Sequence, residues 1–375
     1  MKNFPIKIFL ISFFLQTYTT PSSLACSHRY AAVVIDDRTG KIIHAENAHH
    51  LRHPASLTKK MTLYLLFEAL QKQKITLKTQ FSTSALASRQ IPSKLGLQPG
   101  DKISVQDIIK GLVTKSANDA AVIAAEGLSG SLKNFVVLMN KTAKKLGMQN
   151  TRFYNASGVP DARQVSTAMD MATLGRALYH HFPMHYKYFQ TKHFCYKGHS
   201  HRNHNHMLGE FPGLDGLKTG FTNASGFNIS TSALRYDHHG KPVRLFAVVM
   251  GGQSWKSRDQ RAAFLLESGF RKIGAFNRHR SRVVSFHSKL KKRPSTKEFD
   301  HNHMLNTSLQ QILSPHQGAL RKENSSLPHI IHPIGDKNPA PINFSKKEEK
   351  PLSRPSLPTG WVNPSKAYLK EKSPQ

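Results

Sequence analysis

The feature that most constrains the fold is a nearly unbroken apolar run at residues 243–250. Such a run is typical of a central strand, which needs a neighbouring strand on each edge. A second strand-like run begins after Gly226 and is joined to it by a turn at residues 237–240. Residues 30–35 and 41–45 predict a β-hairpin at the other end of this region. Strands from both ends can therefore join one sheet.

The sequence between these strands has helical periodicity. It predicts helices over residues 54–72, 105–146 with breaks near 115 and 127, 166–181 and 258–270, and a loop over 85–101. Ser166 or Thr167 is expected to cap the third helix. The order of strands, helices, strands and helix predicts an α+β domain over residues 28–275, with a mostly antiparallel sheet flanked by helices.

Basic residues dominate the charge of the chain. Its 375 residues contain 54 Lys and Arg against 22 Asp and Glu, which gives a net charge of +32. Such an excess suits contact with polyanions, but no nucleic-acid-binding motif accompanies it, so we expect no nucleic-acid partner. Residues 276–375 are rich in Ser, Pro, Lys, His and Asn, and we predict a basic, largely disordered tail. This tail could contact an anionic envelope surface.

The amino-terminus resembles a secretory signal. Lys2 and Lys7 precede an apolar run at residues 8–15, and small residues lead up to Ala25. We therefore predict a signal peptide over residues 1–25 and export to the periplasm or cell envelope, either free or peripheral at the membrane. Cys26 would then begin the mature chain, which leaves acylation of Cys26 and a disulfide to Cys195 as open alternatives.

Three short motifs supply the parts of an active-site serine enzyme that uses lysine as its base. They are Ser56-Leu57-Thr58-Lys59, Ser116-Ala117-Asn118 and Lys218-Thr219-Gly220. Ser56 near a helix start would carry a free backbone N–H, and Lys59 lies one helical turn further on. A lysine accepts a proton only when burial or a neighbouring cation lowers its pKa, and Lys218 is the expected neighbour.

Longer segments around the three motifs closely resemble one enzyme family. The segments are Pro54-Ala55-Ser56-Leu57-Thr58-Lys59, Lys115-Ser116-Ala117-Asn118-Asp119-Ala120-Ala121 and Asp215-Gly216-Leu217-Lys218-Thr219-Gly220-Phe221-Thr222. They resemble the low-molecular-mass penicillin-binding proteins, which are serine-type D-alanyl-D-alanine carboxypeptidases, and the resemblance extends over about residues 30–270. It implies a penicillin-binding/β-lactamase-like domain that acts on peptidoglycan stem peptides, binds β-lactam antibiotics and needs no metal or organic cofactor.

The resemblance also implies a role for each motif residue. Ser56 would be the acyl-ester nucleophile, Lys59 its general base, Ser116 a proton relay, and Asn118 a group that positions Lys59 and the substrate amide. The backbone N–H groups of Ser56 and Phe221 would form the oxyanion hole. The substrate carboxylate would be bound by Lys218, Thr219 and Arg258, although Arg258 by itself also fits a helix cap or a surface position.

Two other functions share these motifs. A class A-like β-lactamase would carry a glutamate between the second and third motifs, but residues 127–209 contain none, and the second motif has Ala117 where that class has Asp. The other alternative is a non-catalytic wall-binding protein of the same fold. The intact side chains of the three motifs argue against it. Carboxypeptidase, endopeptidase and transpeptidase activities are not separated by the sequence.

Two further features lack a role in that interpretation. His199, His201, His204 and His206 precede the third motif, and we expect a polar loop there rather than a zinc site, because no ligand set is defined. Lys60 follows the proposed base directly and could approach Ser56 as well, but we expect it to lie toward solvent or the polar rim of the domain.

Overall fold

The computed structural model describes residues 29–277 of the chain. A six-stranded antiparallel sheet forms its centre, in the order β10-β8-β9-β1-β2, with β7 also paired to β8. The strands are β1 (Ala31–Asp36), β2 (Ile42–Glu46), β7 (Leu214–Thr222), β8 (Gly226–Asp237), β9 (Pro242–Gly252) and β10 (Ala275–Phe276). Strands from both ends of this region therefore share one sheet, and the expected α+β class is confirmed.

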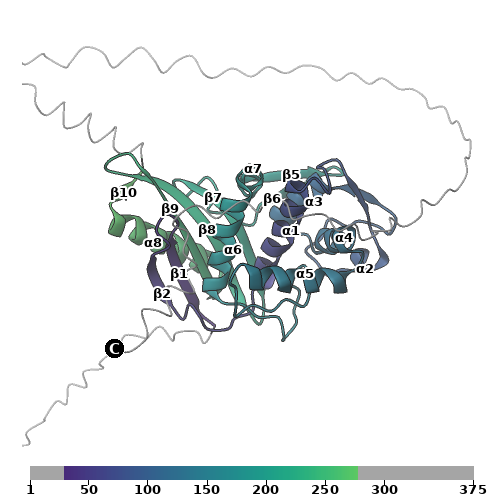
Figure 1. Ribbon diagram of the computed structural model, residues 1–375, viewed down its shortest axis with the longest axis horizontal. Coiled ribbons are helices and arrows are strands. Elements are labelled where there is room, and N and C mark those ends of the chain that lie inside the picture. Colours follow the sequence, from purple (N-terminus) through teal and green to yellow (C-terminus); the bar gives the residue numbers. More distant parts are fainter. Residues whose placement is uncertain (1–28, 278–375) are drawn as a thin grey trace, which may run out of the picture. The chain divides into compact units, whose positions relative to one another are not determined.

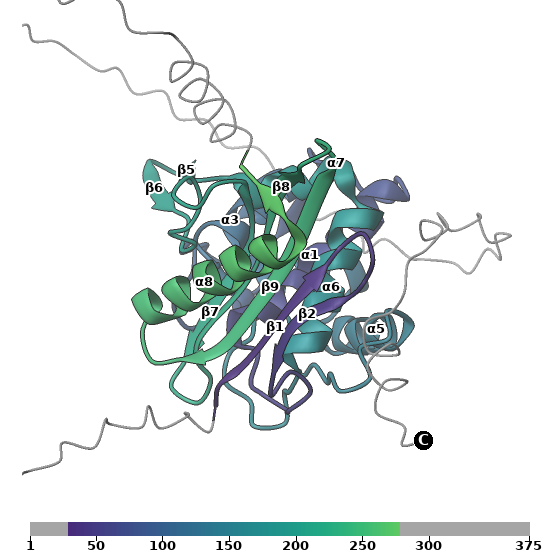
Figure 2. The same ribbon diagram turned by 90° about the vertical axis from the view of Figure 1, so that its left-hand side faces the viewer.

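The apolar run predicted as a central strand is β9, which pairs with β1 on one edge and β8 on the other. Phe246, Val248 and Met250 pack into the core beneath α1 (Lys59–Gln71) and α6 (Ala168–His181). The alternate residues of β9 pack against α8 (Trp255–Ile273) on the opposite face. Figure 2 shows α8 in front of the sheet and α1 and α6 behind it. Burial on both faces explains why the run lacks polar alternation.

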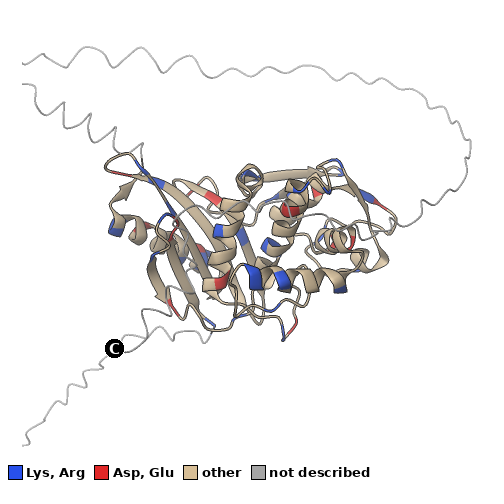
Figure 3. Cartoon of the chain, in the orientation of Figure 1, with Lys and Arg blue, Asp and Glu red and all other residues tan. Residues whose placement is uncertain are grey.

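The remaining helices gather on the α1 side of the sheet (Figure 1). They are η1 (Ala55–Thr58), α2 (Ala85–Ser88), α3 (Val105–Val113), α4 (Asn118–Ser129), α5 (Leu132–Lys145), α7 (Pro183–Tyr186) and η2 (Lys187–Gln190). Two small sheets pair β3 (Gln80–Ser82) with β4 (Lys102–Ser104) and β5 (His193–Tyr196) with β6 (His199–Arg202). Lys and Arg are spread over both the helices and the sheet (Figure 3).

Most helix boundaries agree with the sequence. The breaks expected near residues 115 and 127 separate α3, α4 and α5, and the Thr167 side chain caps α6 by accepting from the backbone N–H of Asp170. The helix expected over residues 54–72 is present, with a first turn, η1, of the 3-10 type before α1. Two predictions were wrong in part. The loop over 85–101 begins with α2, and His199 and His201 lie on strand β6, whereas His204 and His206 lie in the expected loop.

Several predictions concern residues outside the described part. These are the signal peptide over residues 1–25, the acylation or pairing of Cys26, and nearly all of the tail over 276–375. Cys195 itself is exposed on β5. Within residues 29–277, no single helix is long and apolar enough to cross a membrane. Helices α4 and α5 are long and apolar enough only when taken together, and they are bent by 85° relative to each other.

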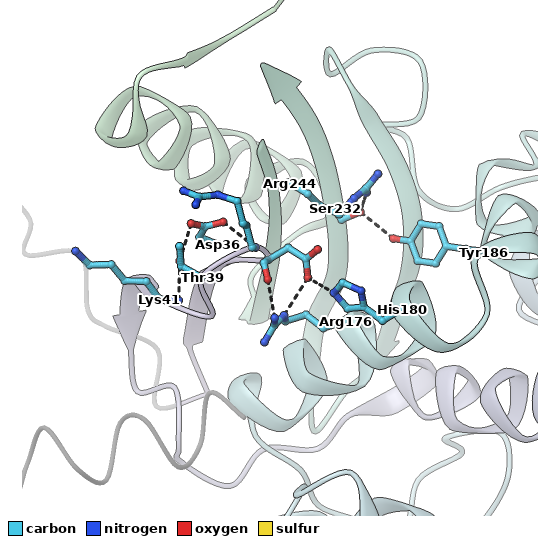
Figure 4. A network of polar contacts seen from close by, with 10 residues as sticks. Asp36, Thr39, Lys41, Arg176, His180, Tyr186, Ser232 and Arg244 are labelled. Carbon is cyan, nitrogen blue, oxygen red and sulfur yellow. Dashed lines mark hydrogen bonds and ion pairs between the residues drawn. The ribbon is translucent and has the colours of Figure 1, made fainter. Parts of the chain in front are cut away.

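Buried ion pairs join the helices to one end of the sheet (Figure 4). Arg176 of α6 donates to the Asp37 carboxylate at 3.1 Å and to its backbone oxygen at 2.6 Å, and His180 lies 2.7 Å from the same carboxylate. Burial alone would raise the pKa of Asp37, but His180 and Arg176 outweigh it and hold that pKa below its usual value. Beside them, Arg244 pairs with Asp215 at 2.6 Å.

Replacing Asp37 with alanine should leave the Arg176 guanidinium buried without its carboxylate. We expect Asp37→Ala to lower the free energy of unfolding by about 3–5 kcal/mol. Asp161→Ala is the control, because Asp161 pairs with Arg163, whose side chain is 69% exposed, and such pairs contribute about 0–1 kcal/mol. Urea denaturation of both variants measures the difference, and equal losses would contradict the expectation.

Candidate active site

Ser56 and Lys59 lie where the short helix η1 passes into α1. The Lys59 Nζ is 3.1 Å from the Ser56 Oγ, and the lysine side chain is completely buried. The start of η1 is fixed to the sheet by Asn228 of β8, whose side-chain amide donates to the backbone oxygens of His53 and Pro54 at 3.0 and 3.3 Å. The predicted nucleophile and base are therefore neighbours on a firmly held helix start.

The Lys59 amine has two further oxygen neighbours. Asn118 Oδ1 lies 2.7 Å from Nζ, and the backbone oxygen of Ser157 lies 2.6 Å from it. A neutral amine has two N–H bonds and one lone pair. Both carbonyl oxygens can only accept, so they take the two N–H bonds and the lone pair is left for the Ser56 hydroxyl. This arrangement orients Lys59 as a base toward Ser56.

The electrostatic surroundings favour this neutral amine. Burial and the positive charge of Lys218 lower the pKa of Lys59 well below its usual value, and Asp119 opposes them in part. Burial and Arg258 lower the pKa of Lys218 in turn to about 7. The expected effect of Lys218 on the pKa of Lys59 therefore has the predicted sign.

The second motif sits in a strained turn before α4. Ser116 has a φ of 61°, a left-handed conformation that is uncommon outside glycine, and its buried Oγ has no hydrogen-bond partner among the described residues. The Ser93 hydroxyl donates to the backbone oxygen of Lys115 at 2.7 Å, and the Asn118 N–H donates to the Ser93 oxygen at 2.7 Å. These hydrogen bonds thus stabilise the strained turn, and the Ser116 hydroxyl remains available to bind a ligand or to transfer a proton.

The third motif lies on β7, whose outer edge pairs with no other strand of the described residues. Lys218 Nζ donates to the backbone oxygen of Thr219 at 2.8 Å. Gly220 lets this strand approach Ser56 closely, because a Cβ there would stand 2.8 Å from the Ser56 backbone nitrogen. Phe221, the other predicted oxyanion contributor, follows at once on the same strand.

One cavity of about 350 Å³ joins the three motifs. Six of the eight predicted site residues line it, namely Ser56, Ser116, Asn118, Thr219, Phe221 and Arg258. Lys59 and Lys218 complete the set as buried neighbours. No Asp or Glu is among the lining residues. Among residues 29–277, no three or more His, Cys, Asp or Glu side chains are grouped so that they could hold a metal ion.

Sequence reasoning missed two residues that shape this site, Ser157 and Gly158. The Ser157 contact with Lys59 uses a backbone oxygen, which any residue type could provide, so no sequence signal marks it. Gly158 follows in a left-handed conformation with a φ of +85°, where a Cβ would lie 1.9 Å from the Ala55 oxygen. Asparagine and glycine near this point, in Asn155-Ala156-Ser157-Gly158, indicate a tight turn but not its contact with Lys59.

The expectation that Lys60 lies toward solvent or the polar rim of the domain was wrong. Its side chain is fully buried, and Nζ donates to the backbone oxygen of Met171 and to the Ser230 hydroxyl, each at 2.7 Å. Burial lowers the pKa of Lys60 to about 7. Because its contacts are to α6 and β8, Lys60 lies away from the hydroxyl of Ser56 and fastens α1 to these elements.

The comparisons with known proteins agree with this geometry. The family model of D-alanyl-D-alanine carboxypeptidase matches residues 18–254. D-alanyl-D-alanine carboxypeptidase DacC of Escherichia coli is 38% identical over 264 residues, which are 68% of this chain and 64% of that protein. The chain thus spans slightly under two thirds of the length of this relative.

Solved structures of penicillin-binding proteins share the fold. Penicillin-binding protein 5 of Haemophilus influenzae matches with a TM-score of 0.61 and 35% identity, over 64% of this chain and 70% of that one. Penicillin-binding protein D2 of Listeria monocytogenes, in a cefotaxime-bound form, matches with a TM-score of 0.57 and 30% identity, over 64% and 96%. The fold and the arrangement of the three motifs thus place the chain in the structural class of these proteins, and the chain belongs to the D-alanyl-D-alanine carboxypeptidase family.

The buried amine of Lys60 should make stability depend on pH. Its pKa is about 7 in the folded protein against a usual value of 10.5, so the unfolded chain binds more protons between these values and stability rises with pH. Replacing Lys60 with methionine should remove up to about 1.4 kcal/mol per pH unit from that rise. Chemical denaturation of wild type and Lys60→Met at several pH values between 7 and 10 measures it.

Lys141→Met on the exposed face of α5 is the matched control, and we expect it to leave the slope unchanged. Lys59 and Lys218 contribute to the slope of all three proteins, so the difference reports Lys60 alone. Identical slopes for Lys60→Met and wild type would show that Lys60 is not held neutral by burial.

Proposed function

We propose that this protein is a serine-type D-alanyl-D-alanine carboxypeptidase. It hydrolyses the terminal D-alanyl-D-alanine bond of peptidoglycan stem peptides through an acyl-Ser56 intermediate, and the same serine is acylated by β-lactam antibiotics. The observation that carries the proposal is the Lys59 amine, whose two carbonyl partners direct its lone pair at the Ser56 hydroxyl. Membership of the carboxypeptidase family and the cefotaxime-bound relative support it.

The proposed reaction follows from the positions of the side chains. Lys59 takes the proton of Ser56 as Oγ attacks the carbonyl between the two D-alanines, and the backbone N–H groups of Ser56 and Phe221 stabilise the oxyanion. The free Ser116 hydroxyl passes a proton to the leaving nitrogen. Water then adds to the acyl-serine and releases the shortened peptide.

The cations of the cavity suit the end of the substrate. The terminal carboxylate of the departing D-alanine carries a negative charge, and Thr219 and Arg258 line the cavity beside the buried Lys218. A cavity without a lining carboxylate adds no repulsion. We further propose that this reaction takes place in the periplasm or cell envelope, in cell-wall remodelling, as the amino-terminal sequence predicts.

Benzylpenicillin tests the nucleophile directly. Incubation should add the mass of one penicilloyl group to the wild-type protein, and Ser56→Ala should acquire none. The wild type should also release D-alanine from a stem pentapeptide. Ser131→Ala, which removes a serine that caps the distant helix α5, is the control and should still form the adduct. A wild-type protein that forms no adduct and releases no D-alanine would sink the proposal.

A substitution at Gly158 tests the orientation of Lys59. A Cβ in contact with the Ala55 oxygen must displace the Ser157–Gly158 turn, and the Ser157 oxygen moves away from the amine. We expect Gly158→Ala to slow acylation by benzylpenicillin by about 100-fold, the scale of a 1 Å misplacement. Stopped-flow measurement of acylation gives the rate.

Gly130→Ala separates the clash from the cost of the backbone conformation. Gly130 also has a positive φ of +71°, but no atom lies within 4 Å of the Cβ position. This variant should lose stability and keep its acylation rate. Equal rates for the two variants would mean that the turn does not orient the base.

A further inference from the structure

The histidine segment before the third motif forms one wall of the cavity. Within residues 203–207, the side chains of Asn203, Asn205 and Met207 are buried, and the alternating His204 and His206 line the cavity. In the alternating sequence Asn-His-Asn-His-Met, the buried side chains thus attach the segment to the protein, and the two histidines face the cavity. Neither histidine is part of the mechanism described above.

The two asparagines hold this segment rigidly. The Asn203 side chain donates to the backbone oxygen of Thr191 at 2.9 Å, and its own oxygen accepts from the Asn205 N–H at 2.9 Å. The Asn205 oxygen accepts from the Met207 N–H at 3.2 Å. The Asn203 amide thus ties the segment to Thr191 and bridges His204 to the backbone N–H of Asn205, and the Asn205 oxygen holds the backbone that follows. Contacts of this kind preorganise a binding group.

The two imidazoles differ in what they contact. His206 packs edge-on against Trp255, with ring centroids 4.6 Å apart, and its Nδ1 lies 3.9 Å from Asp259. His204 makes no hydrogen bond to any residue of the described part, and its ring is exposed in the cavity. His206 is therefore part of the wall, whereas the ring of His204 is left with an unused N–H group.

The charges around His204 are positive. Desolvation by the cavity walls, together with the positive charges of Lys218 and Lys115, lowers the pKa of His204 to about 4. The imidazole is consequently neutral at physiological pH, with one N–H to donate. Arg258 is paired with Asp259 at 2.7 Å, but no carboxylate lines the cavity itself. A neutral donor beside the cations Lys218 and Lys115 therefore suits an anionic ligand group.

We propose that His204 is a substrate-binding residue, whose neutral imidazole donates a hydrogen bond to the C-terminal carboxylate of the peptide bound beside Lys218. This rests on the proposed carboxypeptidase function. The carboxylate lies one residue, about 4 Å of chain, beyond the carbonyl that Ser56 attacks. His204 lines the same cavity as Ser56. A carboxylate one residue from the attacked carbonyl is therefore a nearer partner for His204 than the carboxylates further along the stem peptide.

Kinetics of D-alanine release separate binding from chemistry. We expect His204→Ala to raise KM for a stem pentapeptide by about tenfold, the usual loss for one hydrogen bond to a charged group, and to change kcat by less than about twofold. His204→Gln, whose amide N–H can also donate, should recover most of the loss. His193→Ala, at an exposed histidine of β5 outside the cavity, is the matched control and should behave as wild type.

A binding measurement keeps this test independent of catalysis. In the Ser56→Ala background, calorimetry compares acetyl-D-alanyl-D-alanine with its C-terminal amide. Adding His204→Ala should weaken binding of the acid by about tenfold and leave binding of the amide unchanged. No loss for the acid, or equal losses for acid and amide, would overturn the role of His204 even if the wild type is an active carboxypeptidase. Failure of the wild type to release D-alanine would instead count against the proposed function.

Discussion

The structure depends on the placement of one buried amine. Lys59 has oxygen contacts to residues 56, 118 and 157, so three separate segments must meet at a single nitrogen. Each segment is fixed by contacts of its own. The Thr62 hydroxyl donates to the Ala156 oxygen at 2.7 Å and ties α1 to the turn that carries Ser157. The core between the sheet and the helices α1 and α6 thus also keeps this nitrogen in place.

Burying three lysine amines in this domain opposes folding. Lys59, Lys60 and Lys218 are all buried, and burial lowers the pKa of each. Taking an amine out of water favours its neutral form, which is unfavourable for stability but is the form a general base requires. The large two-sided core around β9 offsets this cost. The sheet and its helices therefore supply the free energy of folding. The buried lysines of the candidate site reduce it.

The sequence predicted the structure correctly where a motif side chain or a simple apolar pattern determined it. Burial on both faces makes residues 245–250 of β9 apolar without interruption, and the strand could be predicted from that run alone. The prediction failed for β7, whose sequence Leu-Asp-Gly-Leu-Lys-Thr-Gly-Phe-Thr contains two glycines and a lysine. Gly220 is required there by the close approach of Ser56, a tertiary constraint that overrides strand propensity. Lys60 was misplaced because α1 is buried on nearly all sides, so helical periodicity could not identify a solvent face.

The residues of the candidate site were predictable as a set because three motifs carry them, but the connections between them were not. A backbone oxygen such as that of Ser157 has no residue-type signature. The sequence likewise does not show which group activates the water in the proposed reaction.

No carboxylate lines the cavity, and His204, with a pKa of about 4, is a far weaker base than an amine. In the proposed reaction, Lys59 receives the Ser56 proton and loses it through Ser116 to the leaving group, so it would return to its neutral form beside the acyl-serine. The same amine would then activate the water as well, and its two carbonyl contacts would govern both halves of the proposed reaction.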